Sequence, residues 1–213
     1  MKGKTITVGG VEFDLQIITV TIIGTLIPML DWYGYNLTST KAYDRFIWYF
    51  LIPALTILLL FREPITSYGF QIGNWRVGLA WTAVVCAIMA VILLFVARTP
   101  AMQTYYQARA PESVPRLLYI TGVDLFGWEF LWRGLMLFAF ARAFGPGAAI
   151  WLQAVPFALL HLGKPATETL TTLFGGAVFG FIAWQSQSFV YPFLIHWFIA
   201  SFTMLLASGK ILY

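Results

Sequence analysis

The run LLYITGVDLFGWEFLWRG, at residues 117–134, decides what kind of fold this chain can have. Its length is close to the roughly 20 apolar residues that a helix needs to cross a bilayer. Its interior nevertheless holds three ionisable side chains, Asp124, Glu129 and Arg133. On membrane-insertion scales each costs about 2.5–3.5 kcal/mol at mid-helix, so the trio opposes insertion by up to roughly 8–10 kcal/mol. We therefore expect this helix to face a protein interior or a wet cavity.

The composition of the whole chain predicts a membrane protein. Of its 213 residues, 60% are apolar, 18% are aromatic and only 10% are charged. A soluble domain carries about a quarter charged residues, so the soluble globular and disordered classes are excluded. The net charge of +4 is spread between apolar runs without a basic cluster. We expect the lipid bilayer, and no nucleic acid, as a partner.

Seven apolar runs divide the chain, and their lengths favour helices over the roughly 10-residue strands of a barrel. They cover residues 16–30, 46–61, 77–97, 117–141, 147–162, 168–185 and 189–207. We predict an all-α, polytopic membrane helical bundle of about seven (six to eight) transmembrane helices. The bundle forms a single membrane-embedded domain over residues 1–213. The polar segment 99–115 is expected to hold a short amphipathic helix, and residues 145–147, Gly-Pro-Gly, a tight link.

Four ionisable side chains in three of these runs are candidates for chemistry. Glu129 and Arg133 are four residues apart, so they share a helix face and can pair, and a purely structural ion pair is the alternative. The only two histidines, His161 and His196, lie at the end of the fifth run and inside the seventh. Imidazoles and a carboxylate on separate helices suit a metal site or a water-activating acid/base site. We expect the four to converge on one water-accessible cavity, which serves a hydrolase or a proton or ion pathway.

Three short motifs resemble those of a known family. They are EFLWRG at residues 129–134, FALLH at 157–161 and HWFIA at 196–200. They look like the motifs E-E-x-x-x-R, F-x-x-x-H and H-x-x-x-N, or a variant, of the CPBP membrane proteases, also called the CAAX prenyl protease 2 or Abi group. Order and spacing agree, and the resemblance covers about residues 67–205.

This resemblance implies an intramembrane endopeptidase in which a glutamate and two histidines activate water to attack a peptide bond. Glu129 matches the second glutamate of the first motif, Arg133 its arginine, and His161 and His196 the two histidines. Two mechanisms stay open: a divalent metal such as zinc held by His161, His196 and Glu129, or no metal. The implied substrate is a membrane-associated peptide or protein, and the implied location is the cell membrane of a prokaryote, as a multi-pass integral protein.

Two positions depart from the family pattern. The first glutamate, which is the family's general base, is Trp128 here, and the last-motif asparagine is Ala200. A tryptophan cannot take a proton, so either Glu129 serves as the base, or another carboxylate reaches the site, or the chain does not cleave peptides. Glu168, seven residues after His161, is the best substitute, and a helix N-terminal carboxylate is its structural alternative.

Other interpretations follow from the same residues. Asp124 is a further candidate base, but it lies about 140° around the helix from Glu129 and should face a different neighbour. Trp128 favours a non-catalytic immunity or scaffold protein that keeps the protease fold. A small proton-coupled transporter that uses Asp124, Glu129 and the histidines as a relay is the third interpretation.

Overall fold

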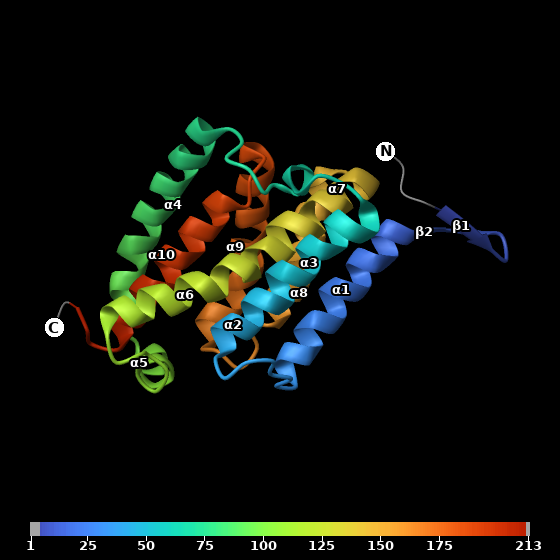
Figure 1. The fold of residues 1–213 in the computed structure, drawn as a ribbon. Helices are drawn as coiled ribbons and strands as arrows, with labels where there is room; N and C mark the ends of the chain where they lie inside the picture. Colours follow the sequence, from blue (N-terminus) through green and yellow to red (C-terminus); the bar gives the residue numbers. More distant parts are fainter. Residues whose placement is uncertain (1–4, 212–213) are drawn as a thin grey trace.

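Each of the seven predicted apolar runs is helical in the structure, a computed structural model that describes residues 5–211 (Figure 1). Six helices of 14 or more residues are α1 (Leu15–Trp32), α4 (Trp75–Val96), α6 (Val114–Glu129), α8 (Pro146–Leu159), α9 (Ala166–Ser186) and α10 (Val190–Ala207). One further rod is built from α2 (Lys41–Phe46), η1 (Ile47–Leu51), α3 (Ile52–Leu55) and η2 (Thr56–Phe61). The segments η4 (Phe130–Met136) and α7 (Leu137–Phe144) continue α6. Two short helices, η3 (Ile65–Tyr68) and α5 (Pro100–Gln107), lie in connections, and α5 is the amphipathic helix predicted for segment 99–115.

The structure confirms an all-α polytopic membrane bundle. Among the described residues, five helical stretches are long and apolar enough to cross a bilayer: Leu15–Trp32, Lys41–Phe61, Trp75–Val96, Ala166–Ser186 and Val190–Ala207. The two other predicted runs are the charged rod α6–η4–α7 and the shorter helix α8. At 14 residues, α8 is about 21 Å long, less than the roughly 30 Å of a hydrocarbon core.

The rod α6–η4–α7 lies at the centre of the packing. All seven residues of η4 are buried, as expected for a segment whose charged groups cannot face lipid. Helix α10 packs against α4 and α6, α2 packs against α6, and α8 packs against α7 and α9. The stretch at residues 117–134 therefore reaches the interior of the bundle, where neighbouring helices can supply partners for its polar groups.

Two glycines of α9 allow that helix to approach α8 closely. A Cβ atom on Gly176 would lie 2.9 Å from Cδ1 of Phe157, and one on Gly180 would lie 2.6 Å from Nε2 of Gln153. Small residues at this spacing are the usual means of close helix contact in membranes. The close approach brings the α9 backbone within hydrogen-bond reach of side chains from α8 and η4.

A β-hairpin, which the pattern of apolar runs does not predict, precedes α1. Strands β1 (Thr5–Val8) and β2 (Val11–Asp14) pair antiparallel, with Ile6 opposite Phe13 and Val8 opposite Val11. The two-residue turn between them, Gly9–Gly10, has positive φ at both positions, as a tight type I′ turn requires.

Candidate active site

Four segments of the chain bring Glu129, Arg133, His161 and His196 together. Glu129 ends α6, Arg133 lies in η4, His161 follows the end of α8, and His196 lies within α10. One carboxylate oxygen, Oε1 of Glu129, accepts hydrogen bonds from Nδ1 of His196 at 2.6 Å and from Nη1 of Arg133 at 3.1 Å. The two imidazole rings are stacked, with centroids 6.4 Å apart. The four residues matched to the family motifs therefore form one cluster.

The helix changes from α to π geometry directly after Glu129. Helix α6 ends at Glu129, and the next seven residues, including Arg133, form the π-helix η4. Such π segments are rare and frequently occur at functional sites. Here the π segment carries the Arg133 guanidinium to the same oxygen that His196 contacts from α10.

Two aromatic rings and a backbone carbonyl hold the Arg133 guanidinium. It lies 3.9 Å from the ring centroid of Phe157 and 5.1 Å from that of Phe179, and Nη2 donates to the carbonyl of Gly176 at 3.3 Å. The amide of Gln153 donates to the same carbonyl at 2.9 Å. Gln153 is fully buried. It lies outside the three family motifs, although it is the one amide side chain within the apolar run 147–162.

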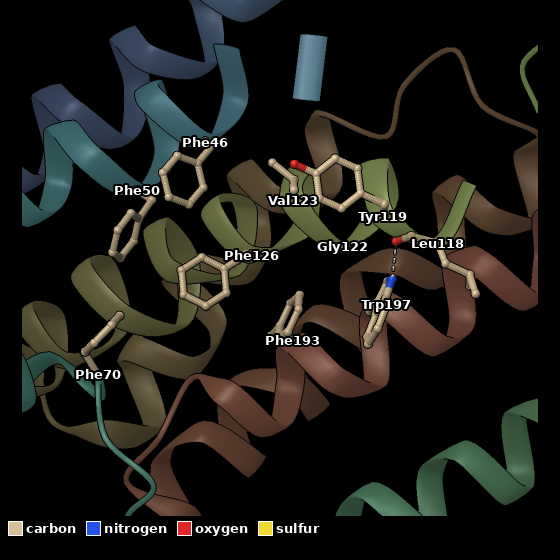
Figure 2. A pocket seen from close by; sticks show the side chains of 10 residues that line it. All are labelled: Phe46, Phe50, Phe70, Leu118, Tyr119, Gly122, Val123, Phe126, Phe193 and Trp197. Carbon is tan, nitrogen blue, oxygen red and sulfur yellow. Dashed lines mark hydrogen bonds between the residues drawn. The ribbon is translucent and has the colours of Figure 1, made fainter. Parts of the chain in front are cut away.

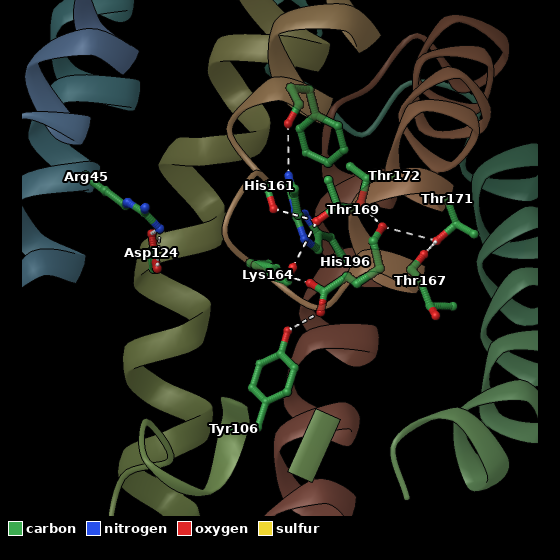
Figure 3. Close-up of polar contacts among 12 residues, drawn as sticks. Arg45, Tyr106, Asp124, His161, Lys164, Thr167, Thr169, Thr171, Thr172 and His196 are labelled. Carbon is green, nitrogen blue, oxygen red and sulfur yellow. Dashed lines mark hydrogen bonds and ion pairs between the residues drawn. The ribbon is translucent and has the colours of Figure 1, made fainter. Parts of the chain in front are cut away.

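His161 is fixed in one tautomer by its own helix. Its Nδ1 lies 2.9 Å from the carbonyl oxygen of Phe157, and because a carbonyl only accepts, Nδ1 carries the proton. The backbone carbonyl of His161 accepts from the hydroxyl of Thr169 at 2.7 Å, which ties the turn after α8 to the start of α9 (Figure 3). In the neutral ring, Nε2 is then left with a free lone pair.

The cluster is closed in this structure, which corrects the expectation of a water-accessible cavity. The exposed fraction is 0% for Glu129 and Arg133, 4% for His161 and 9% for His196. Among the described residues, the second carboxylate oxygen of Glu129, Oε2, and Nε of Arg133 are buried without a hydrogen-bond partner. Unpaired buried polar atoms are uncommon in folded proteins, so these two are candidates for contact with a water or a substrate group.

The described side chains do not form a ready-made metal site. Within residues 5–211, no three His, Cys, Asp or Glu side chains are placed to hold a metal ion together. Nδ1 of His196 points at Oε1 of Glu129, and Nδ1 of His161 points at a backbone carbonyl. An imidazole that binds a metal through Nε2 commonly donates from Nδ1 to a carbonyl or a carboxylate, so these contacts are compatible with either mechanism. The zinc set suggested by the family resemblance, His161, His196 and Glu129, is nevertheless not placed to hold one ion together among the described residues, so we derive no step through a metal.

Trp128 fills the position where the family pattern has its first glutamate. The ring is 4% exposed and packs face to face with Tyr49 at a centroid distance of 5.0 Å. The ring of His161 lies 6.0 Å away on one side, and the guanidinium carbon of Arg45 lies 4.7 Å from the indole centroid. The indole N–H has no hydrogen-bond partner within the described residues, so Trp128 fills space next to the histidines without offering an acceptor.

The two substitute carboxylates considered from the sequence have partners of their own. Asp124 accepts hydrogen bonds from Nη1 of Arg45 at 3.2 and 3.3 Å, and Figure 3 shows this pair apart from the histidines. Glu168 accepts from the hydroxyl of Tyr106 at 2.6 Å and from Nζ of Lys164 at 2.7 Å. Burial and then the neighbouring carboxylate raise the pKa of Tyr106, so its phenol stays a neutral donor. Glu168 thus links α9 to the connecting helix α5.

A groove lined mainly by aromatic and aliphatic side chains runs along the same two helices that carry Glu129 and His196. Its volume is about 540 Å³, and Figure 2 shows its lining: Phe46, Phe50, Phe70, Leu118, Tyr119, Gly122, Val123, Phe126, Phe193 and Trp197. Phe126 precedes Glu129 by three residues on α6, and Phe193 precedes His196 by three on α10. The indole N–H of Trp197 donates to the carbonyl of Leu118 at 2.9 Å, which holds α6 and α10 together there.

Comparison with protein families adds one match. Residues 110–202 match the family model described as Type II CAAX prenyl endopeptidase Rce1-like. The match supports the resemblance to the CPBP/CAAX protease family, and the matched residues include all four clustered residues. No curated protein and no solved structure matches the chain. The five apolar helices, together with this match to a membrane protease family, make this an integral membrane protein whose partner is the lipid bilayer.

Proposed function

We propose that this protein is an intramembrane endopeptidase in which Glu129, assisted by His161 and His196, activates water to attack a peptide bond. The observation that carries the proposal is the Glu129 carboxylate, which has one oxygen held by His196 at 2.6 Å and by Arg133 while the other is unpaired. It lies within a domain that matches a family of endopeptidases. The pairing supports a carboxylate that is held in place and has a free acceptor for a proton.

The proposed reaction uses each group in a defined way. A water molecule gives a proton to Oε2 of Glu129 while its oxygen attacks the carbonyl carbon of the peptide bond. The free Nε2 of His161 accepts the second hydrogen of that water and orients it. The imidazole of His196 and the guanidinium of Arg133 hold Oε1 and stabilise the negative charge that develops nearby. When the C–N bond breaks, the proton on Glu129 passes to the leaving amine, which returns the carboxylate to its starting state.

The groove supports a substrate with an apolar anchor. The matched family is named for prenyl endopeptidases that act at CAAX sequences, and a prenyl group or another apolar segment suits a groove of about 540 Å³ lined by aromatic rings. We propose that such a segment lies along α6 and α10, with the scissile bond carried to Glu129 by local opening of the closed cluster. A prokaryotic cell membrane as the location stays a prediction.

A second function is supported by Trp128. A bulky indole packed beside His161, in place of the carboxylate that the family pattern has there, suits a protein that keeps the fold without cleaving peptides. Such a protein would still bind an apolar segment in the groove. Binding without turnover is therefore the outcome that separates the two proposals.

One experiment tests both. The full chain, purified into nanodiscs, is incubated with a farnesylated CAAX peptide and with the same peptide lacking the farnesyl group, and products are identified by mass spectrometry. We expect cleavage of the farnesylated peptide by the wild type, its loss in Glu129→Gln, and no effect of a chelator. Binding without cleavage supports the scaffold function, and inhibition by the chelator overturns the metal-free mechanism.

A further inference from the structure

The hairpin at the start of the described chain has two chemically different faces. Because side chains alternate along a strand, the pairs Ile6–Phe13 and Val8–Val11 lie on one face. The pairs Thr5–Asp14 and Thr7–Glu12 lie on the other. The hairpin is thus fully apolar on one face and polar or acidic on the other.

The apolar face is uncovered. The exposed fractions are 46% for Ile6, 61% for Val8, 54% for Val11 and 38% for Phe13. Within residues 5–211, none of the hydrophobic clusters includes any of these four side chains. Figure 1 shows β1 and β2 extending away from the bundle at the start of α1. An isolated two-stranded hairpin is marginally stable in water, so this face needs a surface to pack on.

The hairpin lies at the end of a membrane-crossing helix. Asp14, the last residue of β2, caps α1 by accepting from the backbone N–H groups of Gln16 at 2.8 Å and Ile17 at 3.2 Å. No flexible linker therefore separates the hairpin from α1, which begins at Leu15 and is apolar enough to span the bilayer.

Charged groups beside the first turn of α1 indicate where the membrane surface lies. The amide of Gln16, in the first turn of α1, donates to Glu63 at 3.3 Å and to the hydroxyl of Tyr68 at 2.5 Å. Glu63 in turn forms an ion pair with Arg142 at 2.5 Å. Charged side chains of this kind belong at the boundary between lipid and water, so the start of α1 and the hairpin attached to it lie at that boundary.

We propose that the hairpin at residues 5–14 lies on the membrane surface, with Ile6, Val8, Val11 and Phe13 packed on lipid and the polar face towards water. The occupant of the apolar face is the same bilayer that surrounds α1, because the hairpin is continuous with that helix and its other face carries Glu12 and Asp14. This surface element fixes the depth of α1 and does not depend on any peptidase activity.

The chain offers a clean test because Cys86 is its only cysteine. In a Cys86→Ala background, single cysteines are introduced by Val8→Cys or Val11→Cys on the apolar face. Thr7→Cys and Glu12→Cys are the matched controls on the polar face. Each is labelled with a nitroxide in phosphatidylcholine nanodiscs, and its collision rates with oxygen and with a water-soluble nickel complex are measured by electron paramagnetic resonance.

The expected result is a reversal between the two faces. Labels at residues 8 and 11 collide preferentially with oxygen, which concentrates in lipid, and labels at 7 and 12 with the nickel complex. Equal access of all four labels to the nickel complex overturns the proposal. Spin–spin broadening that disappears on dilution with unlabelled protein overturns it in favour of a second copy of the chain as the occupant.

A second measurement needs no substitution. Hydrogen–deuterium exchange of the unmodified chain in the same nanodiscs reports on the inter-strand amides of residues 5–14. A hairpin held on lipid should exchange at least about tenfold more slowly than an unstructured segment. Exchange at the unprotected rate overturns the proposal even where the cysteine variants fail to fold.

Discussion

Nδ1 of His196 donates a hydrogen bond of 2.6 Å to Oε1 of Glu129, across 67 positions of sequence. This contact joins the end of α6 to the middle of α10 and leaves Oε2 of the same carboxylate unpaired. A carboxylate with one oxygen hydrogen-bonded and the other without a partner is oriented before a substrate binds. Such pre-orientation is what general-base catalysis requires.

Removing either imidazole should abolish peptide cleavage while leaving the fold nearly intact. We expect His161→Ala and His196→Ala each to lower kcat/KM by about 10²–10⁴-fold, the usual contribution of acid–base catalysis. Cleavage is followed by mass spectrometry and folding by thermal unfolding in detergent. Gln107→Ala, an exposed position on α5, is the control. Equal unfolding of both histidine variants would instead indicate structural roles.

Glu129→Gln should lower kcat/KM for peptide cleavage far more than Glu168→Gln does. The first removes the proton acceptor and should lower kcat/KM by about 10²–10⁴-fold. The second loosens the contacts to Tyr106 and Lys164 and should change the rate much less. Parallel measurement of the two rates, with folding verified for both, decides which carboxylate is the base. The opposite order would make Glu168 the base.

Trp128→Glu tests whether the indole blocks an otherwise competent site. The substitution restores the family's paired carboxylates and places the new group beside Arg45, which lies 4.7 Å from the indole centroid. If the wild type binds but does not cleave the farnesylated peptide, we expect cleavage to appear in this variant. Trp128→Gln, of similar size but without a charge, is the matched control. Absence of cleavage by a folded Trp128→Glu protein would favour the scaffold function.

Arg45→Met should destabilise the bundle. The guanidinium pairs with Asp31 of α1 at 3.0 Å and with Asp124 of α6 at 3.2 Å. Its loss removes the cation that both carboxylates share in the membrane region and leaves Asp31 with the hydroxyl of Tyr49 and the more distant Lys41. Removing one partner of a fully buried pair costs about 3–5 kcal/mol. We expect less here, because the Arg45 side chain is 21% exposed.

The same cluster supplies the control for Arg45. Lys41 lies 3.6 Å from Asp31, but its side chain is 62% exposed, so Lys41→Met should change stability by less than about 1 kcal/mol. Thermal unfolding of both variants in one detergent measures the difference. An equal, small effect of the two substitutions would show that the Arg45 contacts contribute little.

The free energy of unfolding should decrease at acidic pH because Glu63 becomes protonated. Burial by itself raises the pKa of Glu63, but hydrogen bonds from Arg142, Tyr68 and Gln16 outweigh that effect and hold the pKa below its ordinary value of 4.5. A group whose pKa is lowered by folding stabilises the fold above its unfolded pKa, and this contribution is lost as the pH falls through the folded pKa. Thermal unfolding from about pH 6 to about pH 3 should show the loss, and Glu63→Gln should flatten that part of the profile.

Local features of the sequence were enough to predict the fold class. Apolar runs, a scarcity of charge and breaks at glycine and proline determine where helices lie, because each depends on near neighbours along the chain. The contact between Glu129 and Arg133 also follows from spacing, since residues four apart share a helix face. The hairpin escaped prediction because its strands have four residues each, too few for a periodic pattern to stand out.

Only the tertiary structure decided which partners meet across helices. The contacts of Glu129 with His196, of Glu168 with Tyr106 and of Asp124 with Arg45 each join segments at least 62 residues apart. Such pairings depend on how far one helix slides and rotates against another, and that in turn depends on packing such as the close approach of Gly176 to Phe157. Hydropathy and spacing specify which residues are buried on each helix, but the register between helices is a property of the assembled bundle.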